Sequence, residues 1–376
     1  MRLSETSGRG ELGHKASGGA LFATGVVGSL PRPQFVRELL EAGEGEMVQR
    51  QMDAAVRYAV ALQERAGLDV VTDGEWRRRS YIGVIAELAH GFELGRAPDG
   101  RPWTVVTGRL APHRSGFIAE EIHFVRTCTD RAVKATLPSP ALLGERLWDA
   151  GASSGAYPDR RHFVSDCADI LRDELKRVRD AGADVIQIDD PHLCLFVDPD
   201  VRAGYDDPEA AADFAVEMVN RMVDGVTGVK LAVHLCRRAG ARARGEHTHH
   251  GDYGPILRQL TRLQVQQLTM EFSGPDAGEM DILRGLDQRF EIGLGCVGTT
   301  PGVVDSVEAI VARVEAALQY VPAERIVLNP DCGFAPGSAA RVEIDEVYQK
   351  LKNEVEAAQT LRRRYAGADK PAIGAV

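Results

Sequence analysis

The stretch Ala183-Asp-Val-Ile-Gln-Ile-Asp-Asp-Pro191 decides the fold class of this 376-residue chain. Its first six residues form a short β-type run, which ends at two acids and a proline. Amphipathic helical patterns lie on both sides of it, at 163–181 and at 208–223. A buried strand between two helices is the repeating unit of a parallel sheet covered by helices. The pattern therefore predicts an α/β protein.

The same unit recurs outward from this stretch in both directions. Further helical patterns cover 47–66 and 344–364. Runs typical of strands, each followed by helical sequence, lie at 22–28, 68–71, 133–137, 183–188, 230–233, 263–270, 290–294 and 325–328. Eight such units fit a closed barrel better than an open sheet, so we expect a single-domain (β/α)8 TIM barrel. Two more β-like runs at 103–129 predict an inserted β-hairpin.

Composition and charge restrict the class of function. The formal net charge is -10 and no basic patch dominates, which argues against a nucleic-acid partner. No apolar run reaches about 18 residues, so no membrane span is expected. Residues 1–20 are rich in Gly, Ser, Glu and Arg and lack the apolar core of a signal peptide. We expect a flexible tail there, a barrel domain at 21–376, and a cytoplasmic protein that is compatible with a homo-oligomer.

Six cysteines are available for metal binding, catalysis or packing, since disulfides are rare in a reducing compartment. Cys128 and Cys167 are expected to pack. Cys194 and Cys296 lie near the predicted strand ends and could line a pocket there. The remaining two, Cys236 and Cys332, belong to the candidate metal site.

Polar residues gather at the C-terminal ends of the predicted strands, and these ends form the rim where barrel active sites lie. His234 and Cys236 follow one strand, and alternate residues of an extended chain point to the same side. Glu271 directly follows a second apolar run, and Cys332 lies in the loop after the last run. One nitrogen, two sulfurs and one oxygen form a tetrahedral set suited to Zn²⁺. The alternative for the His-x-Cys pair alone is simple core packing.

The charges of this ligand set indicate its chemistry. Two thiolates and one carboxylate carry three negative charges against the two positive charges of zinc. Such a centre activates water poorly but can hold a thiol as its nucleophilic thiolate. A substrate sulfur that replaced Glu271 would keep four ligands. We therefore expect alkyl transfer from a small-molecule donor to a small-molecule thiol.

The chain resembles the cobalamin-independent methionine synthase superfamily, in its short single-barrel branch, from Thr24 to Arg364. The resemblance is carried by Gly25-Val-Val-Gly-Ser-Leu-Pro31, Asp73-Gly-Glu-Trp-Arg-Arg78, Gln187-Ile-Asp-Asp-Pro191, His234-Leu-Cys236, Met270-Glu-Phe272 and Asn329-Pro-Asp-Cys-Gly-Phe334. It implies that His234, Cys236, Glu271 and Cys332 bind the zinc. In the family this zinc activates homocysteine or, in the epoxyalkane:coenzyme M transferase branch, coenzyme M.

The resemblance also implies a substrate site. The backbone at Gly28 and Ser29 would cradle the carboxylate of an amino-acid thiol, and Glu75 with Asp189 would hold its ammonium group. Asp189 and Asp190 are the expected catalytic acids, where the second is shorter than the glutamate usual in the family motif.

Asp189 and Glu75 could also have purely structural roles. Asp189 could be a capping or turn residue before Pro191. Glu75 could form a salt bridge with Arg77 or Arg78.

Some features depart from the family pattern. The second, N-terminal barrel of full-length methionine synthases is missing. The histidine thought to protonate the departing folate corresponds to Thr300, which argues against folate as the donor. The basic loop 237–251 contains His247-Thr-His-His250, which could bind a second metal or be merely solvated, and its arginines could bind an anionic substrate.

Two rival functions remain open at this point. A barrel that stabilises a thiolate leaving group could act as a carbon–sulfur lyase. Alternatively, the zinc could be structural, in a binding or scaffold protein. A structural site usually has four protein ligands from Cys and His and no open position, which makes Glu271 an unusual member of one.

Overall fold

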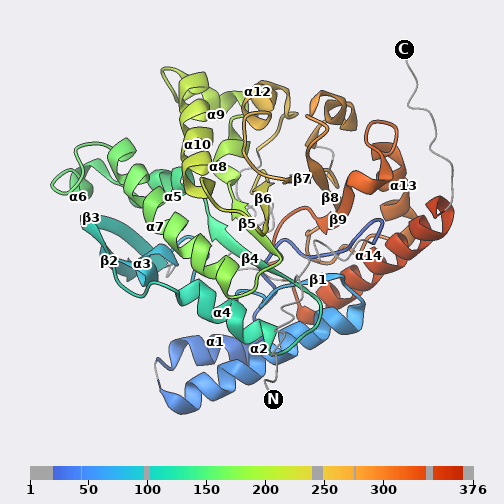
Figure 1. The fold of residues 1–376 in the computed structure, drawn as a ribbon, viewed down its shortest axis with the longest axis horizontal. Helices are drawn as coiled ribbons and strands as arrows, with labels where there is room; N and C mark the ends of the chain where they lie inside the picture. The colour runs from blue at the N-terminus through green and yellow to red at the C-terminus, as the bar shows by residue number, and fades with distance from the viewer. Residues whose placement is uncertain are drawn as a thin grey trace, which may run out of the picture.

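The computed structural model describes residues 20–43, 45–96, 102–238, 249–274, 277–335 and 342–366. Nearly all of the tail expected at 1–20 lies outside these ranges. A parallel sheet occupies the centre of the molecule, in the strand order β1-β4-β5-β6-β7-β8-β9 (Figure 1). Its strands are β1 Val70–Val71, β4 Ala132–Pro138, β5 Val185–Asp189, β6 Lys230–Leu235, β7 Gln267–Glu271, β8 Glu291–Val297 and β9 Ile326–Pro330.

The N-terminal segment closes this sheet into a ring. Thr24 forms a parallel bridge with Leu328 of β9, and Gly25 forms one with Val70 of β1. The Gly25 N–H donates to the Leu328 carbonyl at 3.2 Å, and the Val70 N–H donates to the Thr24 carbonyl at 3.0 Å. The strand predicted at 22–28 is thus reduced to two bridging residues. The expected TIM-barrel fold class is confirmed, with seven parallel strands and this bridging segment among the described residues.

Helices cover the outside of the sheet, and α14 lies against α2 (Figure 1). The helices are α1 Gln34–Glu41, α2 Glu46–Ala66, α3 Ile85–Leu88, α4 Phe117–Arg126, α5 Pro140–Leu147, α6 Ala150–Ser153, α7 Arg160–Asp180, α8 Pro191–Leu195, α9 Pro199–Ala203, α10 Pro208–Val223, α12 Leu257–Leu260, α13 Val307–Ala317 and α14 Ile344–Tyr365, with 3₁₀ turns η2 Gly254–Ile256, η4 Met280–Gly285 and η5 Ala323–Arg325.

Local signals explain where the long helices begin and end. The Asp159 carboxylate accepts the His162 N–H at the start of α7, and Asp207 caps α10 ahead of a proline in its first turn. Gly67 ends α2 in the left-handed region and donates to Gln63 and Glu64 carbonyls. Because these caps depend only on neighbouring residues, the boundaries of the predicted helices match those of the observed helices closely.

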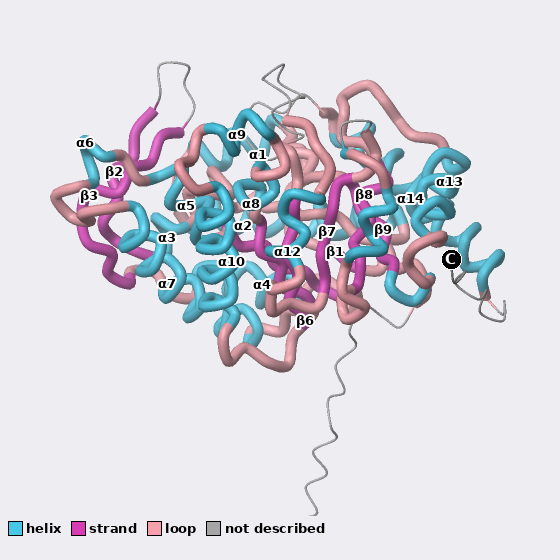
Figure 2. Tube along the Cα trace, turned by 90° about the horizontal axis from the view of Figure 1, so that it is seen from above, coloured by secondary structure: helices cyan, strands magenta, loops and turns pink. Residues whose placement is uncertain are grey.

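The hairpin insertion is real, but its predicted boundaries were wrong. It consists of β2 Ala89–Arg96 paired antiparallel with β3 Pro102–Pro112, and it lies at one end of the molecule, away from the sheet (Figure 2). The second β-like run predicted at 103–129 is helix α4. Its buried residues Ile118, Ile122 and Val125 are spaced four and three apart, which is a helical stripe rather than strand alternation.

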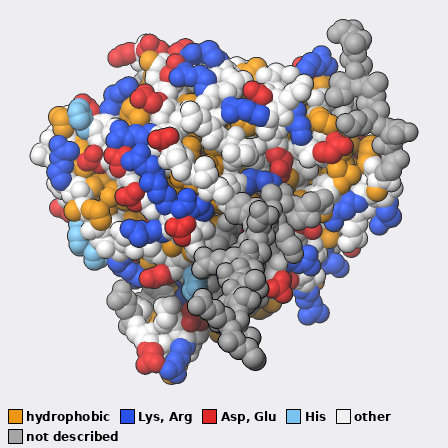
Figure 3. Space-filling view, viewed as in Figure 1, with side chains coloured by type: hydrophobic (Ala, Val, Ile, Leu, Met, Phe, Trp, Pro, Cys, Tyr) orange, Lys and Arg blue, Asp and Glu red, His pale blue; other side chains and the backbone are white. Residues whose placement is uncertain are grey.

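A single large apolar core joins the sheet to its helices, and it includes Cys167, Cys194 and Cys296. The last two cysteines are fully buried and pack within this core. Acidic and basic side chains are interspersed over the face seen in Figure 3. Within the described ranges, no helix combines the length and the apolar character that a bilayer span requires.

Candidate metal centre

Three of the four predicted ligands converge at the C-terminal rim of the barrel. The ligand atoms of His234, Cys236 and Cys332 all lie within 4.8 Å of one another, and all three residues are buried. His234 is in β6, and Cys236 is the first residue after this strand. Cys332 is the second residue after β9. The tertiary fold therefore brings together side chains that are 96 positions apart in the chain.

The donor set and its spacing fit a tetrahedral zinc ion. The two sulfurs are 3.6 Å apart. Two thiolates that bind one zinc at about 2.3 Å in tetrahedral geometry would be separated by about 3.8 Å. The sulfurs would need to move apart by only about 0.2 Å, which is within the reach of side-chain rotation. His234, Cys236 and Cys332 could thus hold a metal ion as they stand.

The electrostatics of the cluster favour ionised donors. The thiol of Cys332 donates to the sulfur of Cys236, and this bond together with nearby His234 holds the Cys236 pKa well below its usual range. Burial opposes protonation of His234, but the charges of Cys236 and Asp189 outweigh it and raise the His234 pKa to about 10. Both shifts arise from the close approach of the three side chains, which is also what binding of a single cation requires.

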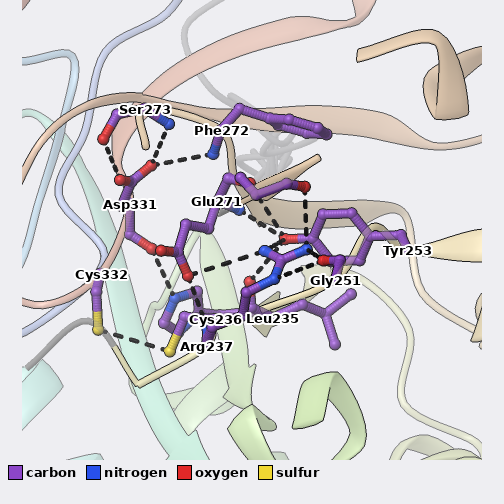
Figure 4. Close-up of polar contacts among 12 residues, drawn as sticks. Leu235, Cys236, Arg237, Gly251, Tyr253, Glu271, Phe272, Ser273, Asp331 and Cys332 are labelled. Carbon is purple, nitrogen blue, oxygen red and sulfur yellow. Dashed lines mark hydrogen bonds and ion pairs between the residues drawn. The ribbon is translucent and has the colours of Figure 1, made fainter. Parts of the chain in front are cut away.

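Glu271 lies beside this cluster, but it is not one of the three residues whose ligand atoms lie within 4.8 Å of one another. It is the last residue of β7 and is fully buried. Its Oε2 accepts the backbone N–H of Arg237 at 2.7 Å. In Figure 4 its carboxylate lies between Arg237 and Asp331. Glu271 is therefore placed next to the cluster, and its role as the fourth ligand stays a prediction.

Asp331 joins the two strand ends that carry Glu271 and Cys332. Its Oδ1 accepts the N–H groups of Phe272 and Ser273, at 3.1 and 2.9 Å, and its Oδ2 accepts the Ser273 hydroxyl. A Cβ at Gly295 would lie 2.6 Å from Asp331 Oδ1, so only glycine allows this approach. The two ligand-bearing loops are consequently tied together.

Asp189 is the partner of His234. The parallel register of β5 and β6 places the two residues side by side, and His234 Nδ1 lies 3.1 Å from Asp189 Oδ1. Gln187 donates to the same oxygen at 2.8 Å, and Lys134 donates to Gln187 at 3.3 Å. This buried line of hydrogen bonds holds the imidazole by Nδ1, and Nε2 lies 3.3 Å from the carbonyl of Asp331, the residue before Cys332.

Glu75 lies near Asp189 at the same rim. Its Oε1 accepts the Thr136 hydroxyl at 2.9 Å. Burial raises the pKa of Glu75, and the charge of Asp189 adds to this rise against the opposing charge of Arg78. The backbone of Glu75 has a φ of 58°, in the left-handed region, which is costly for a non-glycine residue and common at functional sites. Two neighbouring carboxylates suit a cationic group.

The alternative of a salt bridge from Glu75 to its arginine neighbours does not describe the geometry. Arg77 pairs with Asp53 at 2.5 Å, and Arg78 pairs with Glu121 at 2.8 Å in a fully buried contact. Arg78 instead reaches Glu75 through the Thr136 hydroxyl, to which it donates at 3.0 Å.

Gly28 and Ser29 lie between Glu75 and the loop that carries Cys332. A Cβ at Gly28 would be 2.7 Å from Glu75 Oε1. The Ser29 hydroxyl accepts the Ala335 N–H at 3.2 Å, and the Ser29 carbonyl accepts the Phe334 N–H at 3.0 Å. The predicted substrate segment is therefore connected directly to the loop that carries Cys332.

Asp190 has a capping role in the structure. Its Oδ1 accepts the Leu193 N–H at 2.9 Å at the start of α8, and its side chain is fully buried. Burial raises its pKa to about 6. Asp190 directly follows Asp189, the last residue of β5, and is the N-cap residue of α8.

The basic loop is only partly described. Residues 239–248, including His247, lie outside the described ranges. His249 pairs with Asp198 at 2.9 Å. The Arg237 side chain is fully buried and donates to the carbonyls of Gly251 and Ala277. The expectation that the arginines of this loop bind an anionic substrate is therefore wrong for Arg237, since its donors already have protein acceptors.

Sequence reasoning missed the residues that support the ligands. Three of them, Gln187, Asp331 and Arg237, lie within the family motifs or next to a ligand in the sequence. This position next to the expected ligands could have identified them as supporting residues. Lys134 and Tyr253 had no such signal, because their contacts with the site cross between separate strands and loops.

Comparison with known proteins supplies the context for this geometry. The family model described as cobalamin-independent synthase, catalytic domain, matches residues 22–360. The chain is 28% identical over 357 residues to a methionine synthase of Pyrococcus abyssi, covering 91% of this chain and 94% of that protein. It is 29% identical over 356 residues to a methionine synthase of Saccharolobus solfataricus, covering 91% and 95%.

Solved structures show the same fold. A B12-independent methionine synthase of a Shewanella species, in complex with selenomethionine, has a TM-score of 0.76 at 22% identity and covers 92% of this chain and 99% of that one. A putative vitamin-B12 independent methionine synthase of Listeria monocytogenes has a TM-score of 0.69 at 23% identity, covering 91% and 98%.

Proposed function

The chain belongs to the family of cobalamin-independent synthase catalytic domains, and from this premise we propose that it transfers a methyl group to the sulfur of homocysteine. The observation that carries the proposal is the buried group of His234, Cys236 and Cys332 at the barrel rim. Glu271 is proposed as the fourth ligand, since its carboxylate already lies beside the cluster and is fully buried.

Zinc bound by these residues would hold the thiol of homocysteine as a thiolate at neutral pH. The chain's own residues prepare the site for this. Asp189 keeps the His234 ring in place, which fixes the nitrogen that is presented to the cluster. Asp331 ties the Cys332 loop to the end of β7, so the donors keep their spacing.

The amino-acid part of the substrate fits the neighbouring groups. Glu75 and Asp189 together would bind the ammonium group, because a cation relieves the repulsion between two buried carboxylates. The segment at Gly28 and Ser29 would face the substrate carboxylate, and its contacts with residues 334–335 link substrate binding to the Cys332 loop.

The loop after β8 bears on the choice of methyl donor. Residues 298–305 contain no histidine, and counting along the chain without gaps assigns Thr300 to the position of the family's proton donor. The Lys350 ammonium group donates to the Gly298 and Thr300 carbonyls, at 3.0 and 2.8 Å, and fixes the loop. We therefore propose a donor whose leaving group departs without a proton from this loop.

The test combines metal analysis with a thiol screen. Purified wild type should contain about one zinc per chain, and Cys236→Ala and Cys332→Ala should lose it. Cys167→Ala, which changes a buried core cysteine on α7, should keep it. Homocysteine should raise the melting temperature of the zinc form more than cysteine, glutathione or coenzyme M does. A metal-free wild type with full methyl transfer, or release of thiol from thioethers without any methyl transfer, would refute the proposal.

A further inference from the structure

A buried arginine lies directly beside the candidate metal centre. The Arg237 guanidinium donates to the Gly251 carbonyl from Nε at 2.9 Å and from Nη2 at 2.6 Å, and to the Ala277 carbonyl at 3.1 Å. Its planar face lies 4.4 Å from the centre of the Tyr253 ring. No part of this side chain is exposed to solvent. The residue therefore holds a positive charge at a fixed position inside the protein.

This charge faces Glu271. The carboxylate Oε2 accepts the backbone N–H of Arg237 at 2.7 Å, and the Arg237 Nη1 lies 4.0 Å from the same oxygen. Both side chains are completely buried. Arg237 thus contacts the carboxylate through its backbone N–H and also places its guanidinium group nearby.

Tyr253 braces the pair (Figure 4). Its hydroxyl oxygen accepts the Glu271 N–H at 2.9 Å and an Arg237 Nη1–H at 3.2 Å. The hydroxyl can donate its proton to the Leu235 carbonyl or to the Glu271 carbonyl, each at an oxygen-to-oxygen distance of 3.4 Å. A hydroxyl can accept two hydrogen bonds and donate one, so these contacts use its full capacity. They join the end of β6 to the end of β7.

The charge balance of the site explains why a cation next to Glu271 would be favourable. Two thiolates and the Glu271 carboxylate leave one net negative charge around a divalent ion, and Arg237 offsets that charge in a buried place. If a substrate sulfur replaced the carboxylate, the carboxylate would stay buried and would need a partner, because an unpaired buried charge is costly. The Arg237 guanidinium is already adjacent to it.

We propose that Arg237, braced by Tyr253, is a positioning residue that holds the Glu271 carboxylate when the sulfur of the thiol takes its place at the metal. A zinc ion held by His234, Cys236 and Cys332 would favour the thiolate form of the incoming thiol, which would take the place of the carboxylate and release its proton to the solvent. The carboxylate keeps its charge and pairs with the guanidinium. This inference rests on the proposed function.

The experiment measures thiol binding instead of turnover. The apo-protein is loaded with Co²⁺, and the sulfur-to-cobalt absorption is recorded while homocysteine is added. The variants are Arg237→Met, Arg237→Lys and Tyr253→Phe. Arg325→Met is the matched control, since Arg325 also donates to two backbone carbonyls, those of Phe290 and Asp287, but at the amino-terminal end of the strands.

Arg237→Met should raise the Kd for homocysteine by at least about tenfold and leave the absorption of the thiol-free cobalt form unchanged. Arg237→Lys should recover part of the affinity, because it keeps the charge without the planar fork. Tyr253→Phe should raise the Kd by about threefold and covers the case in which Arg237→Met does not fold. Arg325→Met should bind as wild type does.

A wild-type Kd in both Arg237 variants would overturn the inference, and so would a loss of affinity that appears only together with loss of the metal. Either result would leave the proposed function intact. If the wild-type cobalt form itself showed no change with homocysteine, the proposed function would fail instead, and this inference with it.

Discussion

The substitution Gln187→Leu tests whether the buried polar line behind His234 controls the metal. Gln187 donates to Asp189 at 2.8 Å and to the Val27 carbonyl at 2.9 Å, and it accepts from Lys134 at 3.3 Å. Leucine has a similar size but can make none of these bonds. Asp189 would then lose the contact that sets the orientation of its carboxylate.

The size of the effect follows from these contacts. Two of the three bonds involve a charged partner, and each contributes about 1.5–3 kcal/mol, while the bond to Val27 contributes about 1 kcal/mol. The free energy of unfolding should therefore fall by about 4–7 kcal/mol. Because Asp189 orients a candidate ligand, zinc affinity should fall by about 10- to 100-fold.

Two measurements separate these effects. Zinc affinity is measured by competition with a chromophoric chelator, and stability by urea unfolding of the metal-free protein. The matched control is Gln63→Leu, because Gln63 is equally buried and also makes three hydrogen bonds, with the Ala59 carbonyl and with both backbone groups of Thr72. It should lose stability and keep its zinc affinity.

Unchanged zinc affinity in Gln187→Leu would refute the reasoning, since Asp189 would then hold His234 without help. An equal loss of zinc affinity in Gln63→Leu would also refute it, because the effect would then follow general destabilisation of the fold.

Three further predictions concern other parts of the molecule. Burial lowers the pKa of Lys134 from 10.5 to about 8, so between these pH values the unfolded chain binds more protons than the native one. The stability of wild type relative to Lys134→Met, from urea unfolding at each pH, should rise over this window by up to about 3 kcal/mol, and a flat difference contradicts the prediction. Glu121→Gln leaves the buried Arg78 charge without its carboxylate, so the free energy of unfolding should fall by about 3–5 kcal/mol. Replacing both residues by apolar ones should cost less in the same assay, and the idea fails if it costs more. Gly28→Ala pushes a methyl group to 2.7 Å from Glu75 Oε1, which should displace the carboxylate. Calorimetry should then show homocysteine affinity reduced on the order of tenfold with zinc affinity unchanged, and a parallel loss of both would count against a substrate role for Glu75.

The sequence alone determined the alternation of strands and helices and the rim that carries the chemistry. These features depend on short-range patterns, such as apolar periodicity, caps and polar residues at strand ends, which can be read without knowing the partners. The same reasoning selected His234, Cys236 and Cys332, because a parallel barrel places all of its strand ends on one rim. It failed at α4, where a helical stripe of Ile and Val was interpreted as a strand.

Only the tertiary structure decided which groups meet behind these residues. That Thr24 and Gly25 close the ring depends on their contacts with Leu328 and Val70, at large separation in the chain. Arg237 belongs to a loop that appears solvated in the sequence, yet its side chain is buried against Tyr253 and Glu271. The direction of a side chain at a strand end depends on its neighbours across other strands and loops, and a linear pattern contains no information about them.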